Sequence, residues 1–292
     1  MTRLDEVTGS IRTIGVVGLG TMGAGIVQAA LQSGYPVIAW DASEIAVRRG
    51  RDRIDGGLKK FESKGKIEPG QAEVMMGRLK MAEDVSAFAE ADLVVEAVLE
   101  QEGIKTELFG SLDEACPDST ILATNTSSIS ITRLAASTKR PDRFIGMHFM
   151  NPVPLMKLVE VIRGLETSDE TFDVVRSTAA AMGKSPVEVN DSPGFVSNRV
   201  LLPMINEAIF ALHEGVGTPE AIDEVMKLGM NHPLGPLALA DMIGLDVCLD
   251  IMRVLNDGFA DSKYRPCPLL IKMVDSGRLG RKSGRGFYDY GD

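Results

Sequence analysis

One segment near the start of the chain restricts the possible folds more than any other, namely IGVVGLGTMGAGIVQAALQSGYPVIAW followed by Asp41. Its β-branched run at 14–17 predicts a buried strand, and the glycines that follow predict a tight turn. We expect a helix over 22–32, with Gly34 as its C-terminal stop, and a second strand over 37–40. This order of strand, glycine loop, helix and strand predicts a parallel βαβ unit.

The glycines of this turn have the GxGxxG spacing of a dinucleotide-binding loop, with Gly18, Gly20 and Gly23 in the three positions. Gly18 allows the tight turn, Gly20 lets the backbone approach a pyrophosphate, and Gly23 lets helix and strand pack closely. Amide groups at the start of the helix then face the phosphates. We therefore expect the whole loop to contact a dinucleotide: Gly18, Leu19, Gly20, Thr21, Met22 and Gly23.

Asp41 ends the second expected strand, near the ~20-residue offset at which an acidic residue binds a ribose 2′-hydroxyl. A carboxylate at this position would repel a 2′-phosphate, so NAD is favoured over NADP as the cofactor. The alternative is a tight turn that binds no ligand. This alternative is disfavoured because Gly20 has no evident packing reason to lack a side chain.

The first 190 residues continue to alternate between expected strands and helices. Apolar runs predict further strands at 92–100, 120–126, 143–150 and 157–164, with helical stretches between most of them. This alternation predicts an α/β fold, with a doubly wound, mostly parallel sheet covered by helices on both faces. Ligands of such sheets bind beyond the carboxyl ends of the strands. Polar side chains gather at those ends: Asp41, Glu100, Asn125, Ser127, His148 and Asn151.

Past Ser192-Pro193-Gly194 the pattern becomes helical. A helix with good N-terminal signals begins at Thr218-Pro219. The stretch PLGPLALADMIGLDVCLDIMRVL is apolar nearly all round and predicts one buried helix over about 237–255, packed in its own domain or against a second subunit. We therefore expect an NAD-binding domain over 1–190 and a helical domain over 191–292.

Composition excludes several classes of function. Lys and Arg total 31 against 41 for Asp and Glu, a formal net charge of −10, which disfavours nucleic acid as a general partner. The three cysteines are far apart and outside any CxxC, so neither a disulfide framework nor a metal site is expected. No stretch approaches the ~18 apolar residues of a membrane helix, and the start MTRLDEVTGS lacks the apolar run of a signal peptide, so we expect no membrane contact and a cytoplasmic location.

Of the three histidines, His148 is the candidate for catalysis because it ends an expected strand, within HFMNPVPLMKLVEVI. A base at that edge could take a proton from a substrate hydroxyl. Glu160 follows twelve positions later inside the apolar KLVEVI, where a carboxylate costs free energy unless it is paired. A histidine is the obvious partner, but Glu160 could instead face solvent on an edge strand. Spacing alone does not decide between these two interpretations.

The segment RRGRDRIDGGLKKFESKGKIEPG carries many Lys and Arg residues, against the acidic trend of the chain. Composition alone favours a solvated pair of helices. The alternative is a basic flap over an anionic ligand tail, with four lysines on it: Lys59, Lys60, Lys64 and Lys66.

Together, six blocks of the sequence resemble the L-3-hydroxyacyl-CoA dehydrogenases, in the order of that family and over nearly the whole chain. They are GLGTMGAGIVQ with Asp41, NTSSISIT, HFMNPVPLMKLVEVI, DSPGFVSNRVL, HPLGPLALADMIGLD and GRKSGRGFYDY. The resemblance implies a Rossmann-type domain, a helical C-terminal domain that forms a homodimer, and reversible oxidation of an L-3-hydroxyacyl-CoA with NAD. The family includes bacterial 3-hydroxybutyryl-CoA dehydrogenases, so a short acyl chain, with 3-hydroxybutyryl-CoA as the substrate, is the default expectation, although no residue of the sequence specifies the chain length.

The resemblance also implies roles for individual residues. His148 would be the general base and Glu160 its orienting partner. Ser127 would contact the 3-oxygen of the substrate and help to place the nicotinamide, and Asn198 would bind near the reacting end of the acyl group. Besides the glycine loop and Asp41, the NAD contacts would be Glu100, Lys105, Ser127, Asn151 and Lys282, and Lys64 would meet CoA.

One position departs from the family pattern, since Gly57 stands where a related member has a serine in the helix that binds CoA. This departure keeps open a related NAD-dependent dehydrogenase acting on a free 3-hydroxy acid or a sugar acid. A second alternative substrate is 3-hydroxyadipyl-CoA. A non-catalytic NAD-binding protein and one half of a multifunctional fatty-oxidation enzyme are disfavoured, because the catalytic residues are retained together and the length leaves no room for a hydratase domain.

Overall fold

The computed structural model describes residues 11–291 of the chain. The segment MTRLDEVTGS, in which we expect no signal peptide, lies outside these described residues. The chain divides into two compact units between Asp191 and Ser192, and each unit has a hydrophobic core of its own.

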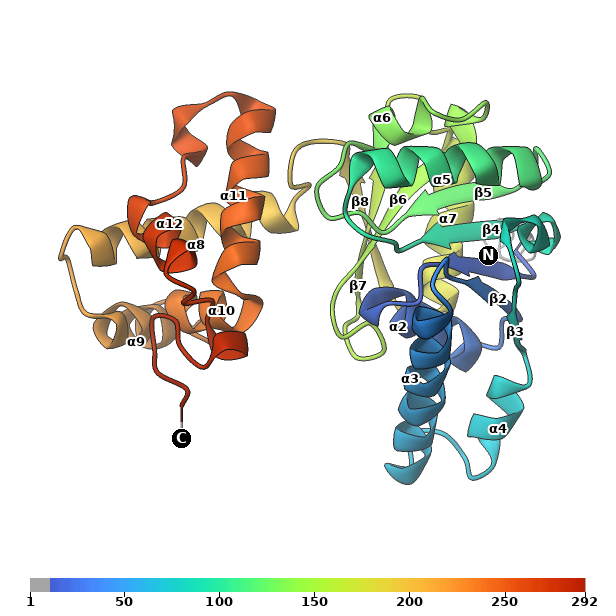
Figure 1. Ribbon diagram of the computed structural model, residues 1–292, viewed down its shortest axis with the longest axis horizontal. Coiled ribbons are helices and arrows are strands. Elements are labelled where there is room, and N and C mark those ends of the chain that lie inside the picture. Colours follow the sequence, from blue (N-terminus) through green and yellow to red (C-terminus); the bar gives the residue numbers. More distant parts are fainter. Residues whose placement is uncertain (1–10, 292) are drawn as a thin grey trace. The chain divides into compact units, whose positions relative to one another are not determined.

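The first unit is built on an eight-stranded sheet with the order β3-β2-β1-β4-β5-β6-β7-β8 (Figure 1). Its strands are β1 (Ile14–Val17), β2 (Val37–Trp40), β3 (Leu79–Met81), β4 (Leu93–Glu96), β5 (Ile121–Thr124), β6 (Phe144–Phe149), β7 (Leu158–Arg163) and β8 (Ser185–Asn190). Neighbouring strands are parallel except for β6 and β7, which are antiparallel. The predicted mostly parallel α/β sheet is therefore confirmed. The strand order reverses between β1 and β4, where such sheets bind their ligands.

Helices cover both faces of this sheet. One core joins alternate residues of the strands, such as Ile14 and Val16, to α2 (Thr21–Gln32), α3 (Glu44–Ser63), α4 (Gln71–Met76) and α7 (Asp169–Ala181). The opposite face carries η1 (Val85–Glu90), α5 (Glu102–Ala115), α6 (Ile131–Ala135) and η2 (Pro141–Arg143). In Figure 1, α5 and α6 lie on the same side of the sheet.

Two strands were absent from the sequence prediction, and the strands predicted over 92–100 and 120–126 are shorter than expected, with four residues each. β3 has only three residues, all at least partly exposed, and β8 contains Pro186 and a single buried residue, so neither shows an apolar run. β4 ends at Glu96 instead of continuing to residue 100. Glu100 therefore lies in a loop that leads into α5.

The second unit is helical. Its elements are α8 (Ser197–His213), α9 (Pro219–Gly229), α10 (Pro236–Ile243), α11 (Leu245–Phe259), η3 (Ser262–Tyr264), α12 (Pro268–Asp275) and η4 (Arg281–Ser283). The prediction of one helix over 237–255 is wrong, because Gly244 has a φ of +106° and separates α10 from α11. The apolar pattern does not show where one helix ends and the next begins, because both helices bury their apolar residues in the same core.

Within residues 11–291, no helix combines the length and the apolar character needed to cross a membrane. In the same range, no three His, Cys, Asp or Glu side chains are grouped so that they could hold a metal ion. The cysteines are buried free thiols, and burial raises the pKa of Cys116 to about 11 and that of Cys248 to about 12. These two thiols are therefore protonated and unreactive at neutral pH.

Candidate active site

Two glycines of the loop after β1 are required by local packing. Gly18 has a φ of +91°, and a Cβ there would lie 2.6 Å from the carbonyl oxygen of Ala97. A Cβ on Gly23 would lie 1.7 Å from the carbonyl oxygen of Gly18, so α2 can approach β1 only without this side chain. A Cβ on Gly20, by contrast, would meet no atom within 4 Å. Packing therefore does not explain Gly20, and space is left for a ligand at the start of α2.

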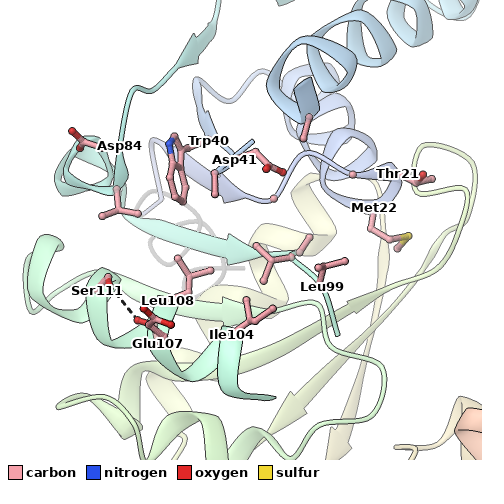
Figure 2. Close-up of a pocket in the computed structure, with 17 residues that line it drawn as sticks. Thr21, Met22, Trp40, Asp41, Asp84, Leu99, Ile104, Glu107, Leu108 and Ser111 are labelled. Carbon is pink, nitrogen blue, oxygen red and sulfur yellow. Dashed lines mark hydrogen bonds between the residues drawn. The ribbon is translucent and has the colours of Figure 1, made fainter. Parts of the chain in front are cut away.

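A cavity of about 860 Å³ opens beside this loop, where β1, β2 and β4 end (Figure 2). Trp40 and Asp41 lie on one side of the cavity, and Ile104 and Leu108 of α5 lie on the other. Val98 and Leu99 add further apolar lining. A cavity with mostly apolar walls and a few fixed polar groups is typical of a cofactor site.

Both carboxylate oxygens of Asp41 are held by backbone amides at the edge of this cavity. Oδ2 accepts a hydrogen bond from Leu19 N at 2.8 Å, and Oδ1 accepts one from Ser43 N at 2.9 Å. A carboxylate fixed at this strand end suits a ribose hydroxyl and repels a phosphate in the same place. The open space at Gly20, the cavity and Asp41 together fit NAD.

His148 and Glu160 are directly opposite residues of the antiparallel strands β6 and β7. Opposite residues of such a pair project from the same face of the sheet, close enough for their side chains to meet. His148 Nδ1 lies 2.8 Å from Glu160 Oε2, and the two side chains are 7% and 3% exposed. Of the two interpretations of Glu160, the structure therefore has the buried carboxylate paired with histidine, not the carboxylate facing solvent.

Ser127 approaches the other nitrogen of the same ring, because its Oγ lies 3.0 Å from His148 Nε2. A carboxylate can only accept a hydrogen bond, so Nδ1 of a neutral ring carries the hydrogen toward Glu160. The lone pair of Nε2 then points to Ser127. This arrangement provides a proton acceptor beside a hydroxyl, with a carboxylate behind it.

Glu100 holds the loop that carries Ser127. Its Oε1 accepts hydrogen bonds from Thr126 Oγ1 at 2.5 Å, Ser127 N at 2.9 Å and Ser128 N at 3.1 Å. Its Oε2 lies 3.3 Å from Lys105 Nζ. Burial opposes ionisation of Glu100, but the Lys105 ammonium and the hydrogen bonds outweigh it and lower the pKa of this carboxyl below its ordinary value.

Lys105 is buried, with its side chain 1% exposed and its Nζ 2.5 Å from Glu96 Oε1. A direct contact between Lys105 and the cofactor therefore stays a prediction. Glu96 is a residue that the sequence analysis did not single out. The signal that identified Glu160, a carboxylate within an apolar strand, is also present in LVVE and could have found it.

Two asparagines flank the end of β6. Asn125 Oδ1 accepts a hydrogen bond from Phe149 N at 2.9 Å, which ties the residue after β5 to the strand that carries His148. Asn151 is exposed and lies two residues beyond the end of β6. Its expected contact with NAD stays a prediction.

Residues 48–63 of the basic segment belong to α3, and residues 64–70 form the turn before α4, so a pair of helices is present in this region, as the sequence predicts. Lys64 is exposed at the C-terminal end of α3. Gly57 has a packing explanation, because a Cβ there would lie 2.2 Å from Oε1 of Gln28 on α2. A side chain at position 57 would therefore displace the end of the Gln28 side chain, which gives this glycine a packing role between α3 and α2 whatever the helix binds.

Asn198 and Lys282 belong to the second unit. Asn198 lies in the first turn of α8, and Lys282 Nζ forms an ion pair with Asp246 Oδ1 at 2.5 Å. Their expected contacts with substrate and cofactor stay predictions.

The sequence matches two family models over nearly its whole length. The model described as "3-hydroxyacyl-CoA dehydrogenase, NAD binding domain" matches residues 13–192, and "3-hydroxyacyl-CoA dehydrogenase, C-terminal domain" matches residues 194–290.

Individual relatives agree with these matches. A "Probable 3-hydroxybutyryl-CoA dehydrogenase" of Bacillus subtilis is 58% identical over 280 residues, which are 96% of this chain and 98% of that protein. The crystal structure of the (S)-3-hydroxybutyryl-CoA dehydrogenase of Ralstonia eutropha has a TM-score of 0.95 and 50% identity, over 97% of this chain and 100% of that one. The "3-hydroxyadipyl-CoA dehydrogenase" of Escherichia coli is 43% identical over 96% of this chain but only 59% of its own length.

Proposed function

The chain belongs to the 3-hydroxyacyl-CoA dehydrogenase family, and on this premise we propose that it interconverts (S)-3-hydroxybutyryl-CoA and acetoacetyl-CoA with NAD. The observation that carries the proposal is the imidazole of His148, engaged by Glu160 on one nitrogen and by Ser127 on the other. Oxidation of a secondary alcohol needs such a group, because the hydroxyl proton must be taken up as the carbon loses hydride.

In the oxidation direction, His148 Nε2 acts as the general base that takes the proton of the 3-hydroxyl. Glu160 stabilises the imidazolium that forms and keeps the ring in one orientation. In the reduction direction, the imidazolium returns this proton to the 3-oxygen. Bound NAD supplies the hydride acceptor, while the protein supplies geometry and electrostatics.

Ser127 and Asn198 are the residues that we assign to orientation of the acyl group. Ser127 Oγ, 3.0 Å from His148 Nε2, can donate a hydrogen bond to the 3-oxygen beside the base. Asn198 supplies a second contact near the reacting carbon. Holding the reacting groups in one geometry can lower the barrier by several kcal/mol.

The CoA part of the substrate is assigned to the basic side of α3. Lys64 is exposed there and would meet the CoA phosphates. Lys64→Ala is expected to raise the KM for acetoacetyl-CoA about tenfold and to leave the KM for NADH unchanged, because a lost phosphate contact weakens binding of that substrate alone.

The short acyl chain is supported by two relatives named for 3-hydroxybutyryl-CoA, at 58% and 50% identity. The relative named for 3-hydroxyadipyl-CoA, at 43% identity, makes that dicarboxylic substrate the second candidate. NADH oxidation with a panel of substrates decides between them. We expect kcat/KM for acetoacetyl-CoA to exceed that for 3-ketoadipyl-CoA and for free acetoacetate by at least about tenfold.

NADPH in place of NADH is the cofactor arm of the same assay. We expect much slower turnover with NADPH, because Asp41 opposes the 2′-phosphate. Comparable rates with free acetoacetate would overturn the CoA assignment, and comparable rates with 3-ketoadipyl-CoA would move the substrate to the second candidate.

We further propose that the second unit forms a homodimer. Val225 and Leu228 on α9 and Met230 just beyond it are 61%, 78% and 60% exposed. Large apolar side chains that lie together at a surface commonly mark an interface between proteins. Sedimentation of a monomer in analytical ultracentrifugation at micromolar concentration would refute this assignment.

A further inference from the structure

Glu96 is a fully buried carboxylate at the end of β4, and the residues around it occupy both of its oxygens. Oε1 accepts hydrogen bonds from Val98 N at 2.6 Å and from Lys105 Nζ at 2.5 Å. Oε2 accepts one from Thr124 Oγ1 at 2.7 Å. No substrate or cofactor atom can reach a side chain that is 0% exposed, so any effect of Glu96 on the reaction must pass through its neighbours.

Lys105 passes the influence of Glu96 on to Glu100. The Lys105 ammonium lies between the two carboxylates, 2.5 Å from Glu96 Oε1 and 3.3 Å from Glu100 Oε2. Glu96 fixes one side of this ammonium, and the ammonium in turn fixes Oε2 of Glu100. The other oxygen of Glu100 then points to the backbone of residues 126–128, where it accepts the amide hydrogens of Ser127 and Ser128.

A second connection runs through Thr124. Its Oγ1 donates to Glu96 Oε2 and accepts a hydrogen bond from Thr126 N at 3.2 Å, one residue before Ser127. Glu96 therefore reaches the loop that carries Ser127 from two sides. Chains of buried hydrogen bonds and ion pairs of this kind restrict the groups at their ends to one arrangement.

We propose that Glu96 is a positioning residue for the reaction, holding Ser127 Oγ against His148 Nε2 through Lys105, Glu100 and Thr124. The proposal rests on the proposed function, because it assigns Glu96 to the same acid–base site. On this view Lys105 serves the site as a buried link between two carboxylates. The loop after β4 also lines the cavity with Val98 and Leu99, so Glu96 couples the cofactor cavity to the catalytic histidine.

The test compares Glu96→Gln with Asp113→Asn. Besides Lys105, α5 carries a second residue in a buried ion pair, Asp113, which lies 2.7 Å from Arg140 Nε. Arg140 also donates a hydrogen bond to Cys116 O at 3.0 Å, so this pair is not connected to Ser127. Both variants remove one buried carboxylate charge and should lower Tm. A purely structural role predicts the same kinetic outcome for both.

We expect Glu96→Gln to lower kcat for acetoacetyl-CoA about 10- to 100-fold, with the KM of acetoacetyl-CoA and of NADH changed less than about threefold, because a misplaced catalytic group costs rate more than binding. Asp113→Asn should keep kcat within about twofold at a temperature well below its Tm. Thr124→Val is the milder second variant, in case Glu96→Gln does not fold, and should lower kcat about three- to tenfold.

A readout independent of turnover is the ¹⁵N NMR signal of His148 Nε2, assigned by its absence in His148→Gln. It should shift in Glu96→Gln and in Thr124→Val but not in Asp113→Asn. An unchanged Nε2 signal in both of the first two variants overturns the proposal, as does a kcat within twofold of the parent chain. If the parent chain turns over no 3-ketoacyl-CoA, the proposed function fails, whereas the NMR comparison still decides whether Glu96 positions Ser127.

Discussion

The glycine loop after β1 and the pair His148–Glu160 belong to the same sheet but reach their geometry by opposite means. The loop depends on side chains that are missing, since a Cβ on Gly18 or Gly23 would collide with backbone within 3 Å. The pair depends on two ionisable side chains that antiparallel pairing places face to face. The loop therefore offers backbone amides and space, and the pair offers a proton acceptor and a charge.

This difference indicates how each region responds to substitution. A loop made of backbone and space binds a cofactor without taking part in proton transfer, so changes in it should alter affinity or folding. The buried histidine–carboxylate pair is the proposed acid–base group, so changes in it should alter rate and its pH dependence. Cofactor affinity and folding stability on one side, and rate and pH dependence on the other, therefore distinguish the two regions.

The largest expected effect is that of His148→Gln. We expect kcat to fall about 10²–10⁴-fold, the usual range for one acid–base group. NADH binding, measured by fluorescence titration, should stay within about twofold because the glycine loop is untouched. His213→Gln is the matched control, since His213 is exposed at the end of α8. Undiminished turnover in His148→Gln would remove the base assignment.

Glu160→Gln should lower kcat about 10- to 100-fold, less than loss of the histidine itself. An amide does not stabilise the imidazolium as a carboxylate does. Ketone reduction needs the protonated ring, so as the pH rises the activity of Glu160→Gln should fall off at a lower pH than that of the parent chain. The pH–rate profile with acetoacetyl-CoA measures this shift. Glu188→Gln on the neighbouring β8 serves as control, because Glu188 is exposed and forms its ion pair with Arg163 Nη1 at 3.4 Å, not with His148. A profile that superimposes on that of the parent chain would contradict the pairing.

A pair of alanine substitutions sharpens the comparison within the loop. Gly20→Ala adds a Cβ that meets no protein atom, so Tm should hardly change while the Kd of NADH rises about tenfold, or about 1.4 kcal/mol. Gly23→Ala adds a Cβ 1.7 Å from Gly18 O and should cost roughly 1–3 kcal/mol of folding free energy. Calorimetry and NADH titration of both variants give the two readouts. Equal losses of Tm would mean that Gly20 also serves packing.

The smallest expected effect concerns Glu100, whose folded pKa is lowered from the ordinary 4.5. A carboxyl of this kind stabilises the fold above pH 4.5, and the stabilisation is lost as the pH falls through its lower folded pKa. Because the side chain is partly exposed, Glu100→Gln should lower Tm at pH 7 by no more than about 2 °C. The difference from the parent chain should shrink below pH 4.5, and exposed Glu114→Gln should show none. A difference that grows on acidification would contradict the lowered pKa.

Much of the architecture follows from local sequence signals. The resemblance to the 3-hydroxyacyl-CoA dehydrogenases is confirmed, and so is the mostly parallel sheet. β1, β2 and α2 lie within one residue of their predicted bounds, because β-branched runs and flanking glycines act over a few residues. β3 and β8 were not predicted, because these edge strands have mostly exposed or partly exposed residues and therefore lack the run of apolar residues that indicates a buried strand. The break at Gly244 was missed because a glycine inside an apolar stretch is also tolerated within a helix.

The sequence by itself determined the dinucleotide loop, Asp41, and the presence of a histidine and a carboxylate twelve residues apart. It could not decide whether Glu160 met His148 or solvent, because that depends on the direction in which β7 runs beside β6. Tertiary structure decided this, and it also brought Glu96, Lys105 and Glu100 together beneath Ser127. The physical reason is that strand pairing and buried charge compensation join residues distant in the chain, whereas turns and helix starts are set by neighbours.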